Sequence, residues 1–317
     1  MVWGVTTNLV LRAHGPEDLL GAVPFLLGFH PRESLVVAVV ERSSISAVAR
    51  VDLADAAVPG RSFQLLEPLL RQLGDGARAA LVGYGDDSDH VHDVVVRVSE
   101  ELPVEPLARI AVCGGHWWHV ECPEEVEVYD PAATQIAAEA AYNGISARPE
   151  RADLESLFRR PARAHTLSAA TLRAAVRRLD RLTPTSAQRR LGFLLDRQLT
   201  AGEVSLTARE CADLLLLLDV PPARDAFWLR LNRKTGPLLM DVWLLVARRA
   251  PVDLSLGPVC AAGIAAWQGS TGALVTIALE QADGLGGWHP LHDLLSQIHR
   301  QALPPSALDE IVACLAA

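Results

Sequence analysis

The sequence lacks long hydrophobic runs, a disulfide framework and a recognisable secretory signal. None of its apolar stretches approaches the roughly 18 to 20 residues that a bilayer-spanning helix needs. The N-terminus has no basic segment followed by an apolar core and a small-residue cleavage site. The five cysteines are an odd number, and they are scattered without disulfide-framework spacing. These absences argue against a membrane protein and a disulfide-stapled secreted domain, and they predict a cytoplasmic protein with reduced thiols.

Lysine is nearly absent: the chain has one lysine, Lys234, and 28 arginines. The formal net charge is −9. The overall composition, 50% hydrophobic and 21% charged, is that of a globular protein. The charge is unevenly spread: residues 148–197 contain 12 arginines and five acidic residues, a local balance of +7. The negative net charge of the whole chain argues against a protein that coats nucleic acid. The basic segment, in contrast, favours an anionic partner.

The first half of the chain alternates strand and helix patterns. β-rich runs predict strands over residues 34–42, 45–53 and 77–85, the first two joined as a hairpin at Ser43 and Ser44. Helical spacing predicts helices over residues 16–29, 61–74 and 86–102. A second hairpin is expected to turn at Gly114-Gly115. The pattern predicts an α/β domain with a mixed sheet over residues 1–147.

The strand patterns end near residue 147. From Asp153 onward, apolar residues recur at helical spacing in segments that proline or glycine separates. They predict helices over residues 168–182, 186–199, 207–218, 223–231, 237–249, 258–267, 272–282, 289–303 and 306–316. Because no 34-residue repeat holds its register, we predict an irregular all-helical domain over residues 148–317.

Six segments resemble those of an actinobacterial family known only as a domain of unknown function. They are "PEDLLGAVPFLLGFHPRESLVV", "ARVDL", "LVGYGDD", "ARDAFW", "VWLLVARRAP" and "AAWQGSTGALVTIALEQA", and the resemblance extends from residue 16 to about residue 305. The chain departs from the family pattern after the last paired helix, where "GLGGWHPLHDLL" replaces an Asp-Pro. The resemblance implies no established activity, cofactor or catalytic residue.

The segment "GFHPRES" raises the question of a catalytic serine. Ser34 could act as a nucleophile, with His30 as its base and Asp52 as the orienting acid. A structural interpretation explains the same residues, because Gly28 permits a left-handed helix end, a proline blocks continuation and Ser34 begins a strand. The usual nucleophile elbow has the order strand, turn, helix, whereas this segment is predicted to have the order helix, turn, strand. The order therefore favours the structural interpretation over the catalytic one.

The segment "YGDDSDHVHD" is a second candidate site. It follows a predicted strand, and ligands of open α/β sheets bind beyond the carboxyl ends of strands. Asp86 and Asp87 are therefore candidate ligand contacts, to a hard cation such as Mg²⁺ among others. The alternative is helix capping, since acidic residues at a helix start accept free backbone N–H groups.

The segment "CGGHWWHVEC" has the residue types of a zinc site but not the geometry. If the chain turns at Gly114-Gly115, Cys113 and His116 face one side of the hairpin and His119 faces the other. Cys122 would lie about 20 Å from His116 at roughly 3.3 Å per residue, so we predict no metal site here.

The basic segment contains a predicted amphipathic helix, "SAATLRAAVRRLDRL". Its core stripe is predicted to be Leu172, Val176, Leu179 and Leu182. Arg173, Arg177 and Arg181 then form one i, i+4 row, with Arg178 beside it. Like charges at this spacing repel. A phosphate backbone, an acidic protein face or the chain's own acidic N-terminal domain would relieve the repulsion; a solvated basic face is the simpler alternative.

"ARDAFW" places Arg224 beside Asp225 on a later helix. The two side chains could form a local ion pair or face a partner together, and the sequence leaves both possibilities open.

We therefore favour a non-catalytic ligand- or partner-binding protein, an adaptor with an unknown protein partner. The alternative is a hydrolase or transferase that uses His30, Ser34, Asp86 and Asp87. It requires His30, Ser34 or Asp52 within about 3 Å of one another or of a shared pocket. A third hypothesis is binding of a phosphate backbone by the basic helix, with affinity that falls steeply with salt. The sequence identifies no cofactor.

Overall fold

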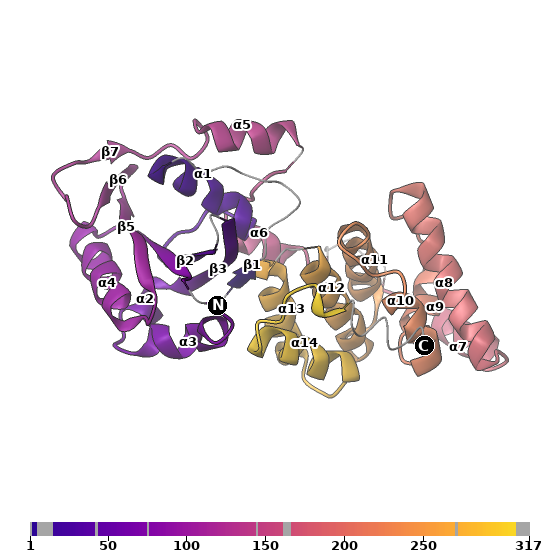
Figure 1. The fold of residues 1–317 in the computed structure, drawn as a ribbon. Helices are drawn as coiled ribbons and strands as arrows, with labels where there is room; N and C mark the ends of the chain where they lie inside the picture. Colours follow the sequence, from indigo (N-terminus) through magenta and orange to yellow (C-terminus); the bar gives the residue numbers. More distant parts are fainter. Residues whose placement is uncertain are drawn as a thin grey trace. The chain divides into compact units, whose positions relative to one another are not determined.

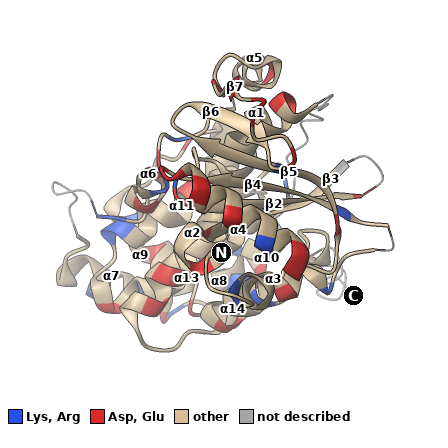
Figure 2. Ribbon diagram, turned by 90° about the vertical axis from the view of Figure 1, so that its left-hand side faces the viewer, with Lys and Arg blue, Asp and Glu red and all other residues tan. Residues whose placement is uncertain are grey.

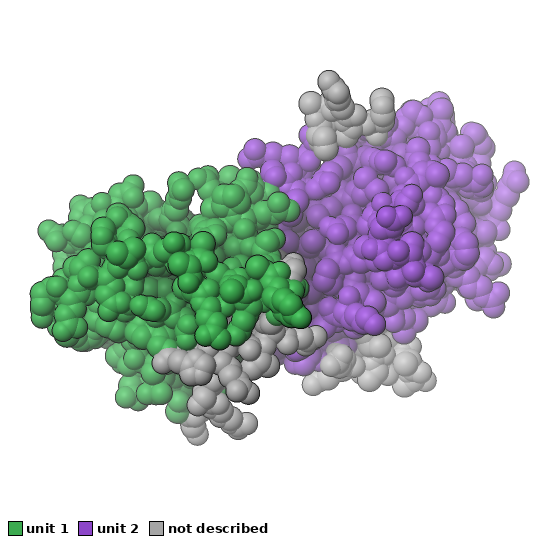
Figure 3. Space-filling view, turned by 90° about the horizontal axis from the view of Figure 1, so that it is seen from above, with its two compact units in different colours: residues 1–154, 271–273, 300–302 green, residues 155–270, 274–299, 303–317 purple. Residues whose placement is uncertain are grey.

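A computed structural model describes residues 2–4, 15–41, 44–74, 76–143, 145–160, 166–269 and 272–308. The chain forms two compact units, coloured separately in Figure 3. The sheet unit comprises residues 1–154, 271–273 and 300–302, and the helical unit comprises residues 155–270, 274–299 and 303–317. The predicted domains 1–147 and 148–317 stay a prediction, because compactness alone does not show that either part folds by itself.

The sheet unit contains a seven-stranded sheet in the order β1-β3-β2-β4-β5-β6-β7. Its strands are β1 (Val2–Gly4), β2 (Ser34–Glu41), β3 (Ser44–Asp52), β4 (Arg78–Tyr84), β5 (Glu105–Cys113), β6 (His116–His119) and β7 (Glu127–Val128). The accompanying helices are α1 (Pro16–Leu27), α2 (Leu53–Ala56), α3 (Arg61–Leu70), α4 (Ser88–Glu101) and α5 (Gln135–Tyr142). Helix α6 (Arg151–Ser156) follows them in the chain.

The predicted mixed sheet is confirmed. Strands β4 and β5 are parallel and connected by α4, whereas the other neighbouring strands pair antiparallel. The hairpin of β5 and β6 turns at Gly114 and Gly115, whose φ angles of 56° and 77° suit glycine. Strands β2 and β3 form the other predicted hairpin, but its predicted turn residue Ser43 lies outside the described residues.

The sheet lies between two layers of helices (Figure 1). Alternate residues of β2, among them Leu35, Val37 and Val39, pack in one core with α2, α3 and α4. Helix α1 covers the opposite face, and α5 packs against α1 (Figure 1). A Cβ at Gly21 of α1 would lie 2.4 Å from the Oγ1 of Thr134, so glycine lets the start of α5 approach α1. This double cover explains why β2 is an almost continuous apolar run.

The helical unit confirms the predicted all-helical second half among the described residues. It contains α7 (Ala169–Leu179), α8 (Pro184–Ala201), α9 (Ala208–Leu217), α10 (Pro221–Trp228), α11 (Gly236–Arg249), the short 3₁₀ helix η1 (Val252–Leu254), α12 (Leu256–Gln268), α13 (Gly272–Leu285) and α14 (Pro290–Arg300). Trp243 of α11 is fully buried and lies edge-on to Phe227 of α10, with ring centroids 5.5 Å apart. Beyond Leu308, the helix predicted over 306–316 lies outside the described residues.

One predicted core position is wrong. Val176 of α7 is 42% exposed, and Ala175 is the fully buried residue of that helix. The other three predicted positions, Leu172, Leu179 and Leu182, are half-buried, so the stripe passes through Ala175 in place of Val176. Within the described part of the chain, no helix is both long and apolar enough to cross a bilayer.

Candidate functional site

The corner between α1 and β2 is a structural junction. Gly28 ends α1 in the left-handed conformation, with φ of 83°, and donates its N–H to the carbonyl of Pro24 at 2.8 Å. Phe29 is buried beside it. The backbone N–H of His30 donates to Arg148 O at 3.0 Å, and the N–H of Arg148 donates to Gly28 O at 2.8 Å. The corner is therefore tied to a segment more than a hundred residues later in the chain.

Ser34 is fully buried at the start of β2 and is engaged on both sides of its hydroxyl group. Its Oγ donates to Arg32 O at 2.5 Å and accepts a hydrogen bond from the Nε of Arg50 at 2.7 Å. Arg50 in turn pairs through Nη1 with Asp52 Oδ1 at 2.7 Å. Arg50 thus occupies the position beside the Ser34 hydroxyl that a general base would need. Its guanidinium group cannot accept a proton and so cannot act as that base. The structure thus brings Ser34 and Asp52 together through arginine and not through His30.

The imidazole of His30 forms no side-chain hydrogen bond with any residue in the described ranges. Burial, and secondarily the nearby charge of Arg32, lower the pKa of His30 from its usual value. The ring is therefore neutral at pH 7, but neither Ser34 nor Asp52 orients it. The hypothesis of ligand contact by His30 stays a prediction.

The other predicted residues gather at the carboxyl edge of the sheet, the edge where β3, β4 and β5 end and β2 begins. Ser34 is paired with Asp52 on one side and with Tyr84 on the other. Asp86 follows Tyr84 by two positions. Glu33, with a positive φ of 41°, accepts the backbone N–H of Asp86 at 2.9 Å through Oε1. The two candidate loops are therefore adjacent, and a carboxylate joins them.

Asp87 serves as the N-cap of α4. Its Oδ1 accepts the backbone N–H groups of two residues in the first turn, each at 3.1 Å. Burial raises the pKa of the neighbouring Cys113 thiol, and the carboxylates of Asp86, Asp87 and Glu33 raise it further. The carboxyl edge is thus acidic, and α4 itself carries more acidic than basic residues (Figure 2). An anionic ligand would meet repulsion here.

The cysteine and histidine residues of the β5–β6 hairpin do not form a metal site. Cys113 pairs with His116 across the turn, whereas His119 pairs with Ile110 three positions further along the hairpin. Trp117 and Trp118 are both buried, on alternate faces of β6. Across the whole described part of the chain, no three His, Cys, Asp or Glu side chains are placed to hold a metal ion together.

The arginine row, defined as Arg173, Arg177 and Arg181, begins on α7 and continues just past its end. All three side chains are exposed, on the side of the helix opposite buried Ala175. No acidic side chain of the described residues pairs with any of them. At 1.5 Å rise per residue, the row is about 12 Å long.

Arg178, which the sequence places beside the row, has a different role. Its Nη2 pairs with Oδ1 of Asp213 on α9, while Arg190 of α8 donates to Oδ2 of the same carboxylate at 2.8 Å. Asp213 is only 1% exposed, so one buried acid joins three helices through two arginines. Sequence periodicity does not reveal this, because Arg178 is one position away from the exposed row.

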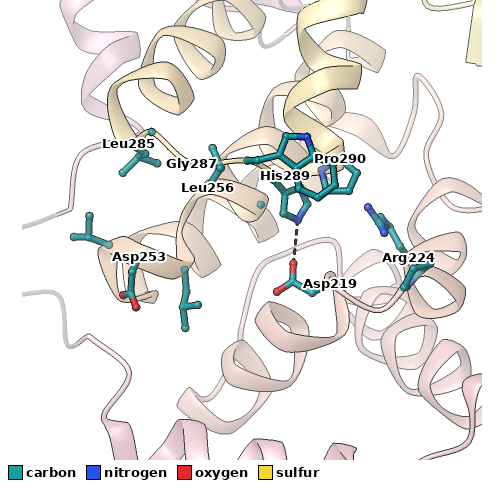
Figure 4. A pocket seen from close by; sticks show the side chains of 14 residues that line it. Asp219, Arg224, Asp253, Leu256, Leu285, Gly287, His289 and Pro290 are labelled. Atoms are coloured by element: carbon teal, nitrogen blue, oxygen red, sulfur yellow. Dashed lines mark hydrogen bonds and ion pairs between the residues drawn. The ribbon is translucent and has the colours of Figure 1, made fainter.

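The helical unit also contains a pocket of about 660 Å³ that the sequence analysis does not predict (Figure 4). Its walls come from the α9–α10 connection, the first turn of α10, η1, the start of α12 and the α13–α14 connection. Asp219, Arg224, Asp253 and His289 contribute its polar groups, and Trp288 its aromatic side chain. The only local sequence signal is the Gly286-Gly287 pair, with φ angles of 68° and 87°, that turns the chain before Trp288.

Arg224 and Asp225 do not form the local ion pair that was considered for them, and the alternative that they face a partner together stays a prediction. Arg224 instead lines the pocket, and Asp225 does not.

Among the comparisons with known proteins, only a family sequence model matches the chain. A family model described as a domain of unknown function, DUF4192, matches residues 16–306. No curated protein and no solved structure shows a significant match.

Proposed function

Because the chain belongs to the DUF4192 family, whose function is unknown, we propose from the geometry that it is a non-catalytic binding protein for an acidic protein partner. The arginine row on α7 is the observation that carries this proposal. The proposal places the protein in the cytoplasm. The four cysteines of the described residues, Cys113, Cys122, Cys211 and Cys260, are free thiols, which supports a reducing compartment.

The row differs from several neighbouring arginines of the same unit. Arg178 and Arg190 share Asp213, Arg197 pairs with Glu210 on α9, and Arg230 forms a bidentate pair with Asp196. These arginines stabilise helix packing from within. Arg173, Arg177 and Arg181 do not, because they point away from α9 and have no acidic partner among the described residues.

Unrelieved charge in this row has an energetic cost. Like charges at i, i+4 destabilise a helix by about 0.2–0.5 kcal/mol per pair. The C-terminal end of the helix dipole offsets this for Arg177, which lies in the last turn, but not for Arg173 in the middle of α7. A partner with acidic side chains at matching spacing would remove the repulsion and gain charge-assisted hydrogen bonds.

Exposed apolar side chains add to the case for a protein partner. Val176 lies between Arg173 and Arg177 in the sequence, and it is exposed despite its apolar character. Arginine combined with apolar side chains is typical of protein interfaces. Nucleic acid is the weaker candidate for the same row, because the chain as a whole carries a net charge of −9.

Catalysis at the carboxyl edge has less support than binding. The Ser34 hydroxyl is buried and occupied by Arg32 and Arg50, and Asp87 is used as a helix cap. A hydrolase or transferase would need these groups to be released from their present contacts.

Site-specific photocrosslinking would test the proposal. A photoreactive amino acid replaces Arg177 in the organism that encodes the protein, and a matched variant carries it at Arg209, an exposed arginine of α9. We expect a crosslinked adduct from position 177 that survives nuclease treatment and contains an acidic protein. The absence of any adduct specific to position 177 would contradict the proposal, and a nuclease-sensitive adduct would favour nucleic acid instead.

A further inference from the structure

The pocket of the helical unit has a fixed wall around His289. The backbone N–H of Leu291 donates to His289 Nδ1 at 3.0 Å, so Nδ1 is an acceptor and Nε2 carries the hydrogen. Nε2 lies 3.0 Å from Oδ1 of Asp219 and donates to it (Figure 4). A Cβ at Gly257 would lie 2.8 Å from His289 Nε2, so glycine at this position lets the start of α12 contact the ring. The histidine therefore orients the Asp219 carboxylate and is not itself free to bind a ligand.

Asp219 presents a negative group to the pocket. Its side chain is 60% exposed, and only Oδ1 is engaged by His289. Oδ2 is left available for a cationic donor. Asp253 of η1 lines the same pocket and has no ion-pair partner within the described ranges.

Arg224 presents a positive group to the same pocket. Its side chain forms no hydrogen bond or ion pair with any residue that the structure describes. Asp219 and Arg224 therefore lie in one pocket without neutralising each other.

Apolar side chains complete the lining of the pocket. Trp288 is 73% exposed, and its Nε1–H donates to Asp293 Oδ2 at 3.0 Å, which holds the indole in position. Val252 and Leu254 are exposed large hydrophobic side chains of the same wall. A volume of about 660 Å³ accommodates a small molecule.

We propose that this pocket binds a small zwitterion, a molecule that carries an amino group and a carboxylate, as free amino acids do. The amino group pairs with Asp219 and the carboxylate with Arg224, while the apolar part contacts Trp288. A purely anionic ligand would leave Asp219 and Asp253 facing a like charge, and a purely cationic ligand would leave Arg224 unpaired. The proposal is independent of partner binding by the arginine row, which shares no residue with the pocket.

Ligand-observed NMR with the full chain would test this inference. The probes are the apolar α-amino acids and a chain-length series of glycine, β-alanine, 4-aminobutyrate and 6-aminohexanoate, because the series samples different charge separations. For any probe that binds, the N-acetyl and amide derivatives remove one charge at a time from the ligand. We expect at least one probe to bind and each derivative to bind about 10-fold more weakly.

Protein variants complete the test. Asp219→Asn keeps an oxygen acceptor for His289 but removes the charge, and Arg224→Gln removes the cation; each should weaken binding about 10-fold. The controls Asp225→Asn and Arg233→Gln lie outside the pocket and should leave binding unchanged. The inference is overturned if no probe binds at millimolar concentration, or if the charge-stripped probes bind the wild-type protein as well as their parents do. Because the derivatives are tested on the wild-type protein, a folding defect in a variant does not rescue the proposal.

Discussion

The carboxyl edge of the sheet and the outer surface of the helical unit both concentrate charged and polar side chains, but they use them differently. At the sheet edge, Ser34, Arg50 and Asp52 form one chain of contacts, and Asp87 caps α4. In the helical unit, the arginine row and Arg224 have no partner among the described residues. Residues that suggest chemistry, such as Ser34 and Asp87, are therefore used in structural contacts, while the groups proposed to bind lie in a region with no catalytic pattern.

The largest expected effect on stability concerns the buried carboxylate that Arg178 and Arg190 share. Asp213→Ala should lower the free energy of unfolding by about 3 kcal/mol, because Arg178 and Arg190 lose a shared, buried counter-charge. Urea unfolding monitored by circular dichroism measures it. Asp196→Ala, which removes the exposed partner of Arg230, is the control and should cost less than about 1 kcal/mol. Equal losses in the two variants would contradict the larger contribution of the buried carboxylate of Asp213.

The role of Ser34 gives the next largest effect. Ser34→Ala should lower the free energy of unfolding by about 1–3 kcal/mol, since the buried Nε–H of Arg50 loses its acceptor. Asp52→Asn, at the exposed end of the same chain of contacts, should cost less than about 1 kcal/mol. Denaturant titration of both variants gives the comparison. An unchanged or higher stability of Ser34→Ala would count against a structural role and would strengthen the catalytic hypothesis.

A third prediction concerns the wall of the pocket. Gly257→Ala should destabilise the protein by about 1–2 kcal/mol, because its Cβ would displace His289. Gly284→Ala on α13, where a Cβ meets no atom within 4 Å, should instead stabilise by about 0.5–1 kcal/mol. Thermal unfolding of the two variants measures the opposite signs. If Gly257→Ala is as stable as the wild type, the close approach of α12 to His289 is wrong.

The smallest expected effect is a pH dependence. The hydrogen bond from Arg197, together with capping contacts from Thr207, lowers the pKa of Glu210 to about 2. A folded-state pKa below the unfolded value of about 4.3 stabilises the protein above that value, and the contribution is lost as pH falls toward 2. Because Arg197 is 41% exposed, the contribution should be below about 1 kcal/mol. The stability difference between wild type and Glu210→Gln should therefore shrink between pH 4.5 and pH 2; a constant difference would contradict the ion pair.

The local sequence pattern was enough to predict the helices and strands, but it did not predict the side-chain contacts between distant parts of the chain. The apolar run of β2 and the glycine pair at 114–115 determine a strand and a turn through nearest-neighbour chemistry, so both are confirmed. The inward direction of Arg178 depends on Asp213, 35 residues away, and the pocket joins Asp219 to His289 across 70 residues. Such contacts arise from the packing of helices that are distant in sequence, so they cannot be predicted from residue spacing.

Partner capture with charge-reversed protein would show whether the arginine row binds an acidic protein. The variant Arg173→Glu, Arg177→Glu, Arg181→Glu reverses the row. The control Arg209→Glu, Arg233→Glu, Lys234→Glu changes the net charge equally at exposed positions of the same unit. Quantitative mass spectrometry of proteins copurified from the encoding organism, at low and at high salt, compares both with the wild type.

We expect an acidic protein that copurifies with the wild type and with the control, is lost from the row variant, and is released by salt. Recovery of the same proteins from all three forms would contradict the claim that the arginine row is a binding surface.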